Sequence, residues 1–180
     1  MDRRNFARNV LVGALGATAA PVFAQYEPGY DRARPRPGML PLGPGEQRYA
    51  ADTLAIGGVS LRASQMAQGR ARAPRVAEFA EFEVAEQTTV SQILTEMGAS
   101  PPPPAPMDQR MLDRLSAARG PDFETQYVMG QMDGHRRLLA VQERYIAEGR
   151  DPHARHLAML ARGQIREHMR LLQDIQQRMG

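Results

Sequence analysis

The sequence predicts an all-α protein in which two helical hairpins are joined by a long crossover. Between residues 46 and 178, apolar residues recur three and four positions apart, which is the spacing of a helix face and not of a strand. Glycine, proline and aspartate residues divide this stretch into four long segments. Four consecutive prolines at 101–104 separate the second segment from the third and require an extended spacer.

The first hairpin is predicted over residues 46–97. Its first helix, 46–68, contains Gly57 and Gly58. Each glycine costs about 1 kcal/mol relative to alanine inside a helix, so we expect a neighbouring helix to approach closely there. Pro74 is placed to begin the second helix and Gly98 to end it. The second helix has an inward stripe with spacings of 4, 3, 4, 3 and 4: Val76, Ala80, Glu83, Gln87, Val90 and Leu94.

The second hairpin follows a short helix in the crossover. We expect Asp108 to cap this short helix, 109–119, and Asp122 to cap the third long helix, 122–148. Asp151 and Pro152 are expected to open the fourth helix, 152–178. Two hairpins with one long connection have the connectivity of ferritin-like folds. The sequence therefore predicts a ferritin-like four-helix bundle over residues 46–180, with a proline-rich crossover between helices two and three.

The composition excludes several classes of function. The chain has 180 residues and a net charge of only +3, and all of its 23 basic residues are arginines. That charge and the low aromatic content do not favour nucleic-acid binding. The absence of cysteine excludes disulfides, thiolate zinc sites, iron–sulfur clusters and a cysteine nucleophile. No Ser-His-Asp spacing, phosphate-binding glycine loop or paired-acid motif is present, which favours a non-enzymatic role.

The N-terminal region has the layout of an export signal. Residues 1–24 comprise a basic start, an apolar run too short to cross a bilayer and the small-residue exit Val22-Phe-Ala24, so cleavage is expected between Ala24 and Gln25. The pair Arg3-Arg4 followed by Phe6 resembles a twin-arginine signal, with the general secretory route as the alternative. We expect a periplasmic or cell-envelope protein without a transmembrane segment in its mature chain. Residues 25–45, rich in proline, glycine and arginine, are predicted to be a disordered leader.

A buried polar layer is predicted across the four long helices. Partners across a short antiparallel hairpin have residue numbers that sum to about twice the turn centre, which places His135 near the level of His168. The same argument places Glu83 beside Ser60. We therefore expect one internal hydrogen-bonded layer with these members: Ser60, Glu83, Gln87, His135 and His168.

The polar layer admits a structural and a metal-binding interpretation. A hydrogen-bonded network without a cofactor is the first. The alternative is a single iron or zinc ion held by Glu83, His135 and His168. Copper has its own candidates in two helical stripes of soft ligands: Met129, Met132 and His135, and His153, His156 and Met159. Glu78, Glu81 and Glu86 are assigned to a solvated face of the second helix.

The chain resembles a known family, the exported bacterial domain of unknown function 4142, often labelled predicted outer membrane protein. The resemblance spans residues 49–175. It depends on the order of several short pieces: Tyr49-Ala-Ala with Gly57-Gly58, Val76 with Phe79-Ala80, Asp122-Phe123 with Tyr127 and His135, and Arg166-Glu-His168. The resemblance implies export and a ferritin-like helical bundle, and it implies no activity.

These observations lead to a functional expectation with an alternative. The expected protein is an exported, non-enzymatic bundle of structural, stress or interaction type, with an envelope protein as partner and homo-oligomerisation left open. The alternative is a metal-binding protein or metal-dependent enzyme that uses Glu83, His135 and His168.

Overall fold

The computed structural model describes residues 42–179, which form five helices and no strand. These are α1 (Pro44–Gln68), α2 (Pro74–Glu96), α3 (Pro106–Ala117), α4 (Gly120–Glu148) and α5 (Pro152–Met179). The predicted all-α class is confirmed. The expected signal peptide, its cleavage site and residues 25–41 of the leader lie outside the described residues. No helix in the described part of the chain is long and apolar enough to span a membrane.

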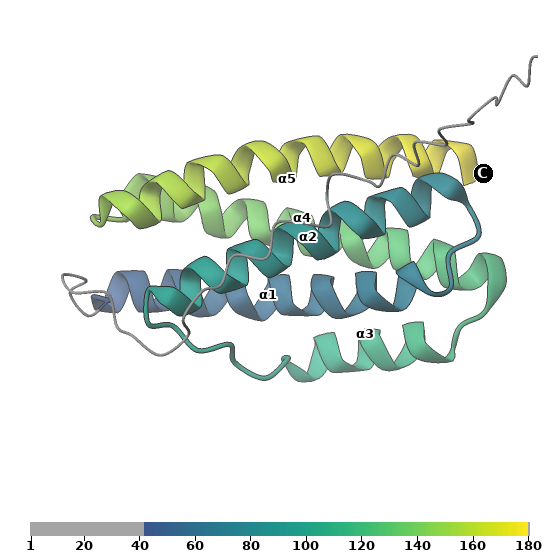
Figure 1. Ribbon diagram of the computed structural model, residues 1–180, viewed down its shortest axis with the longest axis horizontal. Helices are drawn as coiled ribbons and strands as arrows, with labels where there is room; N and C mark the ends of the chain where they lie inside the picture. Colours follow the sequence, from purple (N-terminus) through teal and green to yellow (C-terminus); the bar gives the residue numbers. More distant parts are fainter. Residues whose placement is uncertain (1–41, 180) are drawn as a thin grey trace, which may run out of the picture. The chain divides into compact units, whose positions relative to one another are not determined.

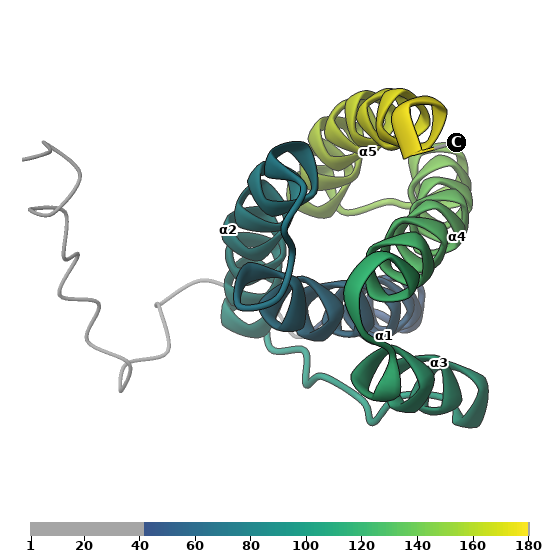
Figure 2. The ribbon, with the colours of Figure 1, turned by 90° about the vertical axis from the view of Figure 1, so that its right-hand side faces the viewer.

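The four long helices surround a common interior. Viewed along their axes, α1, α2, α4 and α5 form a ring, with α3 outside it against α1 and α4 (Figure 2). The order along the chain is visible in Figure 1. Helices α1 and α4 run antiparallel, since Tyr49 contacts Gln142 and Ser64 contacts Tyr127. Each pair of ring neighbours therefore brings mid-helix residues to one level.

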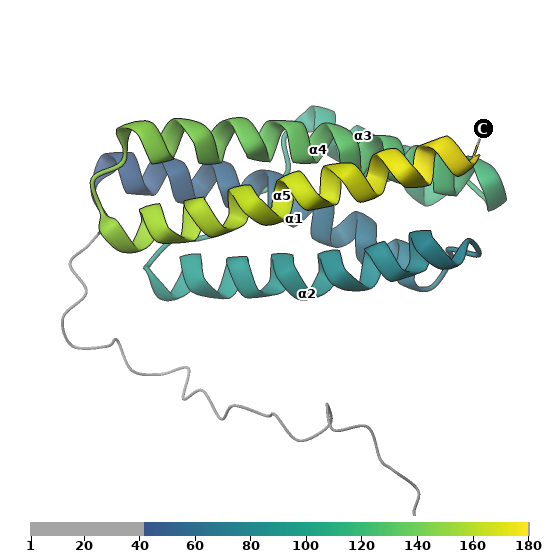
Figure 3. The ribbon, with the colours of Figure 1, turned by 90° about the horizontal axis from the view of Figure 1, so that it is seen from above.

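Helices α2 and α5 also run antiparallel. The start of α2 and the end of α5 lie at the same end of the molecule (Figure 3), where Arg75 Nη1 is 3.1 Å from Asp174 Oδ2. Both of these side chains are substantially exposed, so this ion pair contributes little stability. It shows, however, which faces of α2 and α5 are turned toward each other.

Two of the expected helix caps are wrong. Asp108 and Asp122 lie inside the first turns of α3 and α4, because these helices begin at Pro106 and Gly120. Proline fixes φ and has no N–H to satisfy, so it starts a helix without a side-chain cap. Asp108 is instead buried and forms a two-pronged salt bridge with Arg137, which ties α3 to α4. The Asp151 cap is present, with Ala154 N–H donating to Asp151 Oδ1 over 2.8 Å.

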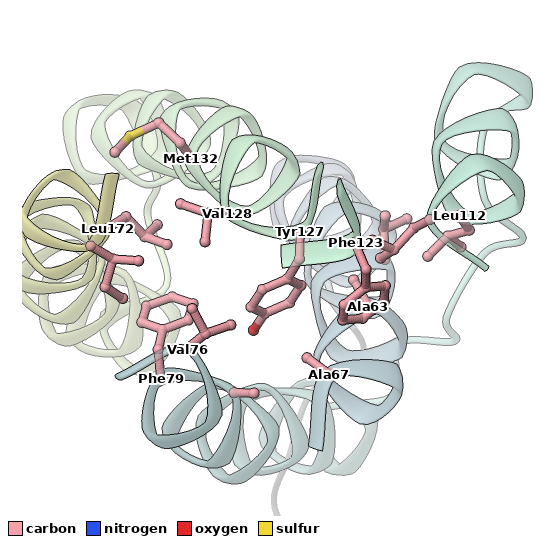
Figure 4. Close-up of a cluster of buried hydrophobic side chains, with 14 residues drawn as sticks. Ala63, Ala67, Val76, Phe79, Leu112, Phe123, Tyr127, Val128, Met132 and Leu172 are labelled. Carbon is pink, nitrogen blue, oxygen red and sulfur yellow. The ribbon is translucent and has the colours of Figure 1, made fainter. Parts of the chain in front are cut away.

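The interior contains two hydrophobic clusters, one toward each end of the four long helices. The cluster in Figure 4 gathers Val76, Phe79, Tyr127, Val128 and Leu172 from three helices. The other is built around the stacked rings of Tyr49 and Tyr145, whose centroids are 4.1 Å apart. Of the inward stripe predicted for the second helix, Val76, Ala80, Glu83, Gln87 and Leu94 are buried and Val90 is partly buried.

Only one of the two adjacent glycines in α1 explains the expected close approach. A Cβ on Gly57 would collide with Oε1 of Gln87, whereas a Cβ on Gly58 would meet nothing. The absence of a side chain at Gly57 therefore lets α2 bring Gln87 against the α1 backbone.

Candidate functional site

The candidate site is a cluster of three buried groups between the hydrophobic clusters. Glu83 comes from α2, His135 from α4 and His168 from α5, and each is at most 5% exposed. His168 Nδ1 lies 2.9 Å from Glu83 Oε2. His135 Nε2 lies 3.3 Å from both of these atoms. Three atoms of metal-binding type thus converge on one point.

The ring nitrogen of each histidine that points away from the cluster has a polar partner of its own. His135 Nδ1 donates to the backbone carbonyl of Gln131 over 2.7 Å, so Nε2 is the His135 nitrogen that faces Glu83 and His168. His168 Nε2 lies 3.3 Å from Glu86 Oε1 on the other side of its ring. The inward atoms are therefore an imidazole nitrogen from each histidine and one carboxylate oxygen.

The other carboxylate oxygen of Glu83 opens a chain of buried hydrogen bonds. Ser60 Oγ lies 2.6 Å from Glu83 Oε1 and 2.5 Å from Gln131 Oε1. The Gln131 amide also contacts Ser64 Oγ, which is 2.8 Å from Tyr127 OH. Because a hydroxyl has one hydrogen, Ser60 can donate to only one of its two neighbours. An ionised Glu83 is the stronger acceptor, and the Ser60 proton therefore belongs to it.

The aromatic ring of Phe79 packs against the cluster. The Phe79 ring centroid lies 5.1 Å from that of His168 and 5.9 Å from that of His135. Phe79 is itself 2% exposed and contacts Tyr127 edge-on. On this side the three polar groups are thus shielded from water by an apolar ring, and buried charge is stable only when it is paired.

Burial and pairing shift the ionisation of the cluster in opposite directions. Burial alone would raise the pKa of Glu83, but hydrogen bonds from His135 and His168 outweigh it and place that pKa far below its ordinary value. Burial lowers the pKa of His168, yet the hydrogen bonds with Glu83 and Glu86 prevail and raise it to about 9. In the metal-free protein at neutral pH, an imidazolium therefore lies between two carboxylates.

The metal-free protein should lose stability as the solution becomes alkaline. The pKa of His168 is about 9 in the fold and 6.5 as its ordinary value, so its contribution is complete below pH 6.5 and is lost as the pH rises through 9. Glu83 has a lowered pKa, so its contribution is present above about pH 4.5 and declines in acid. Urea unfolding in a chelator at pH 6 and pH 9 measures this. Equal stability at both values would contradict the ion-paired cluster.

The structure brings together four of the five predicted layer residues. Ser60, Glu83, His135 and His168 are linked directly. Gln87 is buried nearby, but its amide is placed against Gly57. The rule for antiparallel partners used only the helix spacing and the turn centres. It could not specify the direction of each side chain within a level.

Two residues of the site were missed or misassigned from the sequence. Gln131 lies one turn before His135 on α4 and was not among the predicted members of the polar layer. Glu86 was assigned to the solvated face of α2, and this is wrong because it is half-buried against His168. Glu78 and Glu81 are exposed as expected. The spacing Glu83-x-x-Glu86 was the available signal, since residues three apart share a helix face.

The side chains of the two candidate copper stripes differ in exposure. Met129 is 60% exposed whereas Met132 is buried, and His135 points into the cluster described above. His153 and His156 are exposed at the start of α5, and among the described residues the convergent group of histidine and carboxylate ligands is the one formed by Glu83, His135 and His168.

Fold and site together define an all-helical protein with two histidines and a glutamate buried at its centre. The chain belongs to the family described as domain of unknown function DUF4142, whose profile matches residues 35–175. The family resemblance inferred from the sequence is thereby confirmed. No curated protein and no solved structure matches the chain.

Proposed function

We propose that this chain is an exported, non-enzymatic helical-bundle protein that holds one divalent transition-metal ion at Glu83, His135 and His168. The observation that supports this most directly is the convergence of three ligand atoms 2.9 to 3.3 Å apart. A point equidistant from atoms so spaced and just outside their plane lies about 2 Å from each, the length of zinc–nitrogen and zinc–oxygen bonds. The proton on His168 Nδ1 occupies this place in the metal-free protein.

The surroundings of the ligands favour metal binding over a purely structural network. Metal-bound histidines typically donate their second ring N–H to a carbonyl or carboxylate, as His135 does to Gln131 and His168 does toward Glu86. A network that served stability alone is more simply built from apolar residues, because the desolvation of a buried ion pair offsets much of its attraction. Two histidines and one carboxylate suit Zn²⁺ or Fe²⁺.

The enclosure of the site supports a storage, carrier or structural role over catalysis. All three ligands are buried, and Phe79 lies against both imidazole rings. A catalytic metal needs an open coordination position that a substrate reaches. We further propose that the four long helices form a ferritin-like bundle with α3 in its crossover. The residues then correspond to a single metal ion, because Ser60 and Gln87 stand where a di-iron bundle would need ligands.

Metal analysis of the purified protein tests the proposal. We expect about one zinc or iron ion per chain after purification from the exported fraction, and tight binding of added Zn²⁺ by titration against a chromophoric chelator. Glu83→Gln and His135→Ala should each weaken binding by at least about 100-fold, because a three-ligand site loses one of its ligands. The matched control is the double variant His153→Ala/His156→Ala, which removes the two exposed histidines and should bind as the wild type does. The proposal would be refuted by much less than one metal ion per chain, or by loss of binding in the His153→Ala/His156→Ala variant. The interpretation that then remains is a hydrogen-bonded network without a metal.

Export is tested separately on the N-terminal region. The mature chain recovered from the envelope fraction should begin at Gln25 by intact mass. Replacing Arg3 and Arg4 together by lysine should block export if the route requires twin arginines. Export of that variant at the normal level would indicate the general secretory route, and retention of residues 1–24 would contradict cleavage.

A further inference from the structure

We propose that Glu86 is a positioning residue of the metal site, which holds the proton of the neutral His168 imidazole on Nε2 so that the lone pair of Nδ1 is free to bind the ion. This inference rests on the proposed metal site and adds a residue that does not touch the metal. Two features of α2 support it: the placement of Glu83 and Glu86 on one helix face, and their contacts with opposite edges of a single imidazole ring.

Helix α2 contacts both nitrogens of His168. Glu83 Oε2 is 2.9 Å from Nδ1, and Glu86 Oε1 is 3.3 Å from Nε2. Residues three apart on a helix are neighbours on its surface, so the two carboxylates are held at the two edges of the ring by one rigid element. A half-turn flip of the His168 ring would put carbon atoms in the places of both nitrogens and would break both contacts.

The tautomer matters because a neutral imidazole offers only one lone pair. When a metal ion takes the place of the Nδ1 proton, the remaining proton must be on Nε2, and Glu86 is the acceptor in reach of it. Without this acceptor, the proton is free to occupy Nδ1, and the nitrogen that faces Glu83 and His135 then cannot ligate. Glu86 therefore selects the ligating form of His168.

The second carboxylate differs from the first in its exposure. The Glu83 side chain is fully buried, whereas that of Glu86 is 27% exposed. Glu86 therefore carries its charge in partial contact with water on the side of α2 that faces α5. A partly solvated acceptor stabilises the Nε2–H without the full desolvation cost of a second buried carboxylate.

The test compares Glu86→Ala and Glu86→Gln. We expect Glu86→Ala to weaken Zn²⁺ binding by about 10- to 100-fold, the usual effect of losing such a partner of a ligating histidine. Glu86→Gln retains a carbonyl oxygen that accepts from Nε2–H and should remain within a few-fold of the wild type. The matched control is Glu81→Ala, which removes one charge from an exposed position on the same helix and should change nothing.

Nitrogen-15 NMR of the imidazole rings in Zn²⁺-loaded protein distinguishes positioning from general stabilisation. The His168 Nε2–H signal should be present in the wild type and in Glu86→Gln, and in Glu86→Ala it should be lost by exchange with water or replaced by that of a His168 ring that no longer binds the ion. Wild-type affinity together with an unchanged Nε2–H signal in Glu86→Ala would overturn the inference while leaving the metal site intact. Absence of Zn²⁺ binding by the wild type itself would overturn both proposals.

Discussion

Replacing Glu83 by leucine should lower the free energy of unfolding of the metal-free protein by about 3 to 5 kcal/mol, because removal of one partner of a buried ion pair leaves the other uncompensated. Glu83 is fully buried and contacts Ser60, His135 and His168 at once. Its loss deprives the His168 imidazolium of its closest counter-charge and the Ser60 hydroxyl of its acceptor. Urea unfolding in a chelator, followed by circular dichroism, measures the change.

A triple variant separates the stability of the cluster from its function. Glu83→Leu, His135→Leu and His168→Leu together remove every charge of the cluster and fill similar volume. We expect this protein to recover most of the stability lost in the single variant, because apolar replacement of a whole buried ionic group is often neutral or stabilising. It should bind no metal. If the triple variant is as unstable as Glu83→Leu, the cluster is needed for folding and the case for a functional role weakens.

Replacing Phe79 by alanine should cost about 3 to 5 kcal/mol of stability, the range for deletion of a large buried aromatic ring. Phe79 lies at the junction of the hydrophobic cluster and the polar site, with contacts to Tyr127, His135 and His168. Loss of the Phe79 ring would also remove the packing that holds both imidazole rings in place. We therefore expect weaker Zn²⁺ binding along with a lower urea midpoint.

Phe82 provides the matched control for this prediction. It is the same residue type on the same helix, but it is 49% exposed. Phe82→Ala should change the free energy of unfolding by no more than about 0.5 kcal/mol and leave Zn²⁺ affinity unaltered. Comparable losses in both variants would show that the effect comes from α2 as a helix and not from the packing of Phe79.

Periodicity predicted the helices well because an inward stripe depends on local spacing alone. The bounds of α2 and α5 differ by at most one residue from those expected, 74–97 and 152–178. The starts of α3 and α4 were expected three and two residues too late. We expected aspartate to cap both helices, whereas each helix begins two residues before the aspartate and has a proline within its first two positions. The level of His135 relative to His168 followed from the turn between α4 and α5, since the two helices are connected by a short loop.

Contacts between helices that are far apart in the sequence could not be predicted in the same way. The contact of Glu86 with His168 joins α2 to α5, and the contact of Gln131 with Ser60 joins α4 to α1. No turn connects either pair directly, so neither register follows from the numbering. The sign of the shift in the pKa of His168 was open for the same reason, because burial and a nearby carboxylate act in opposite directions.

The amino-acid sequence alone therefore determines the helices, their inward faces and the family, because these depend on spacing within one segment. Only the tertiary structure decides that Glu83, His135 and His168 meet at one point. It also decides that the Gln87 amide lies against Gly57 and that Glu86 contacts Nε2 of the His168 imidazole. The physical reason is that side-chain direction and helix register are set by packing among all four long helices. A shift of a single turn, about 5.4 Å, would separate the three ligand atoms.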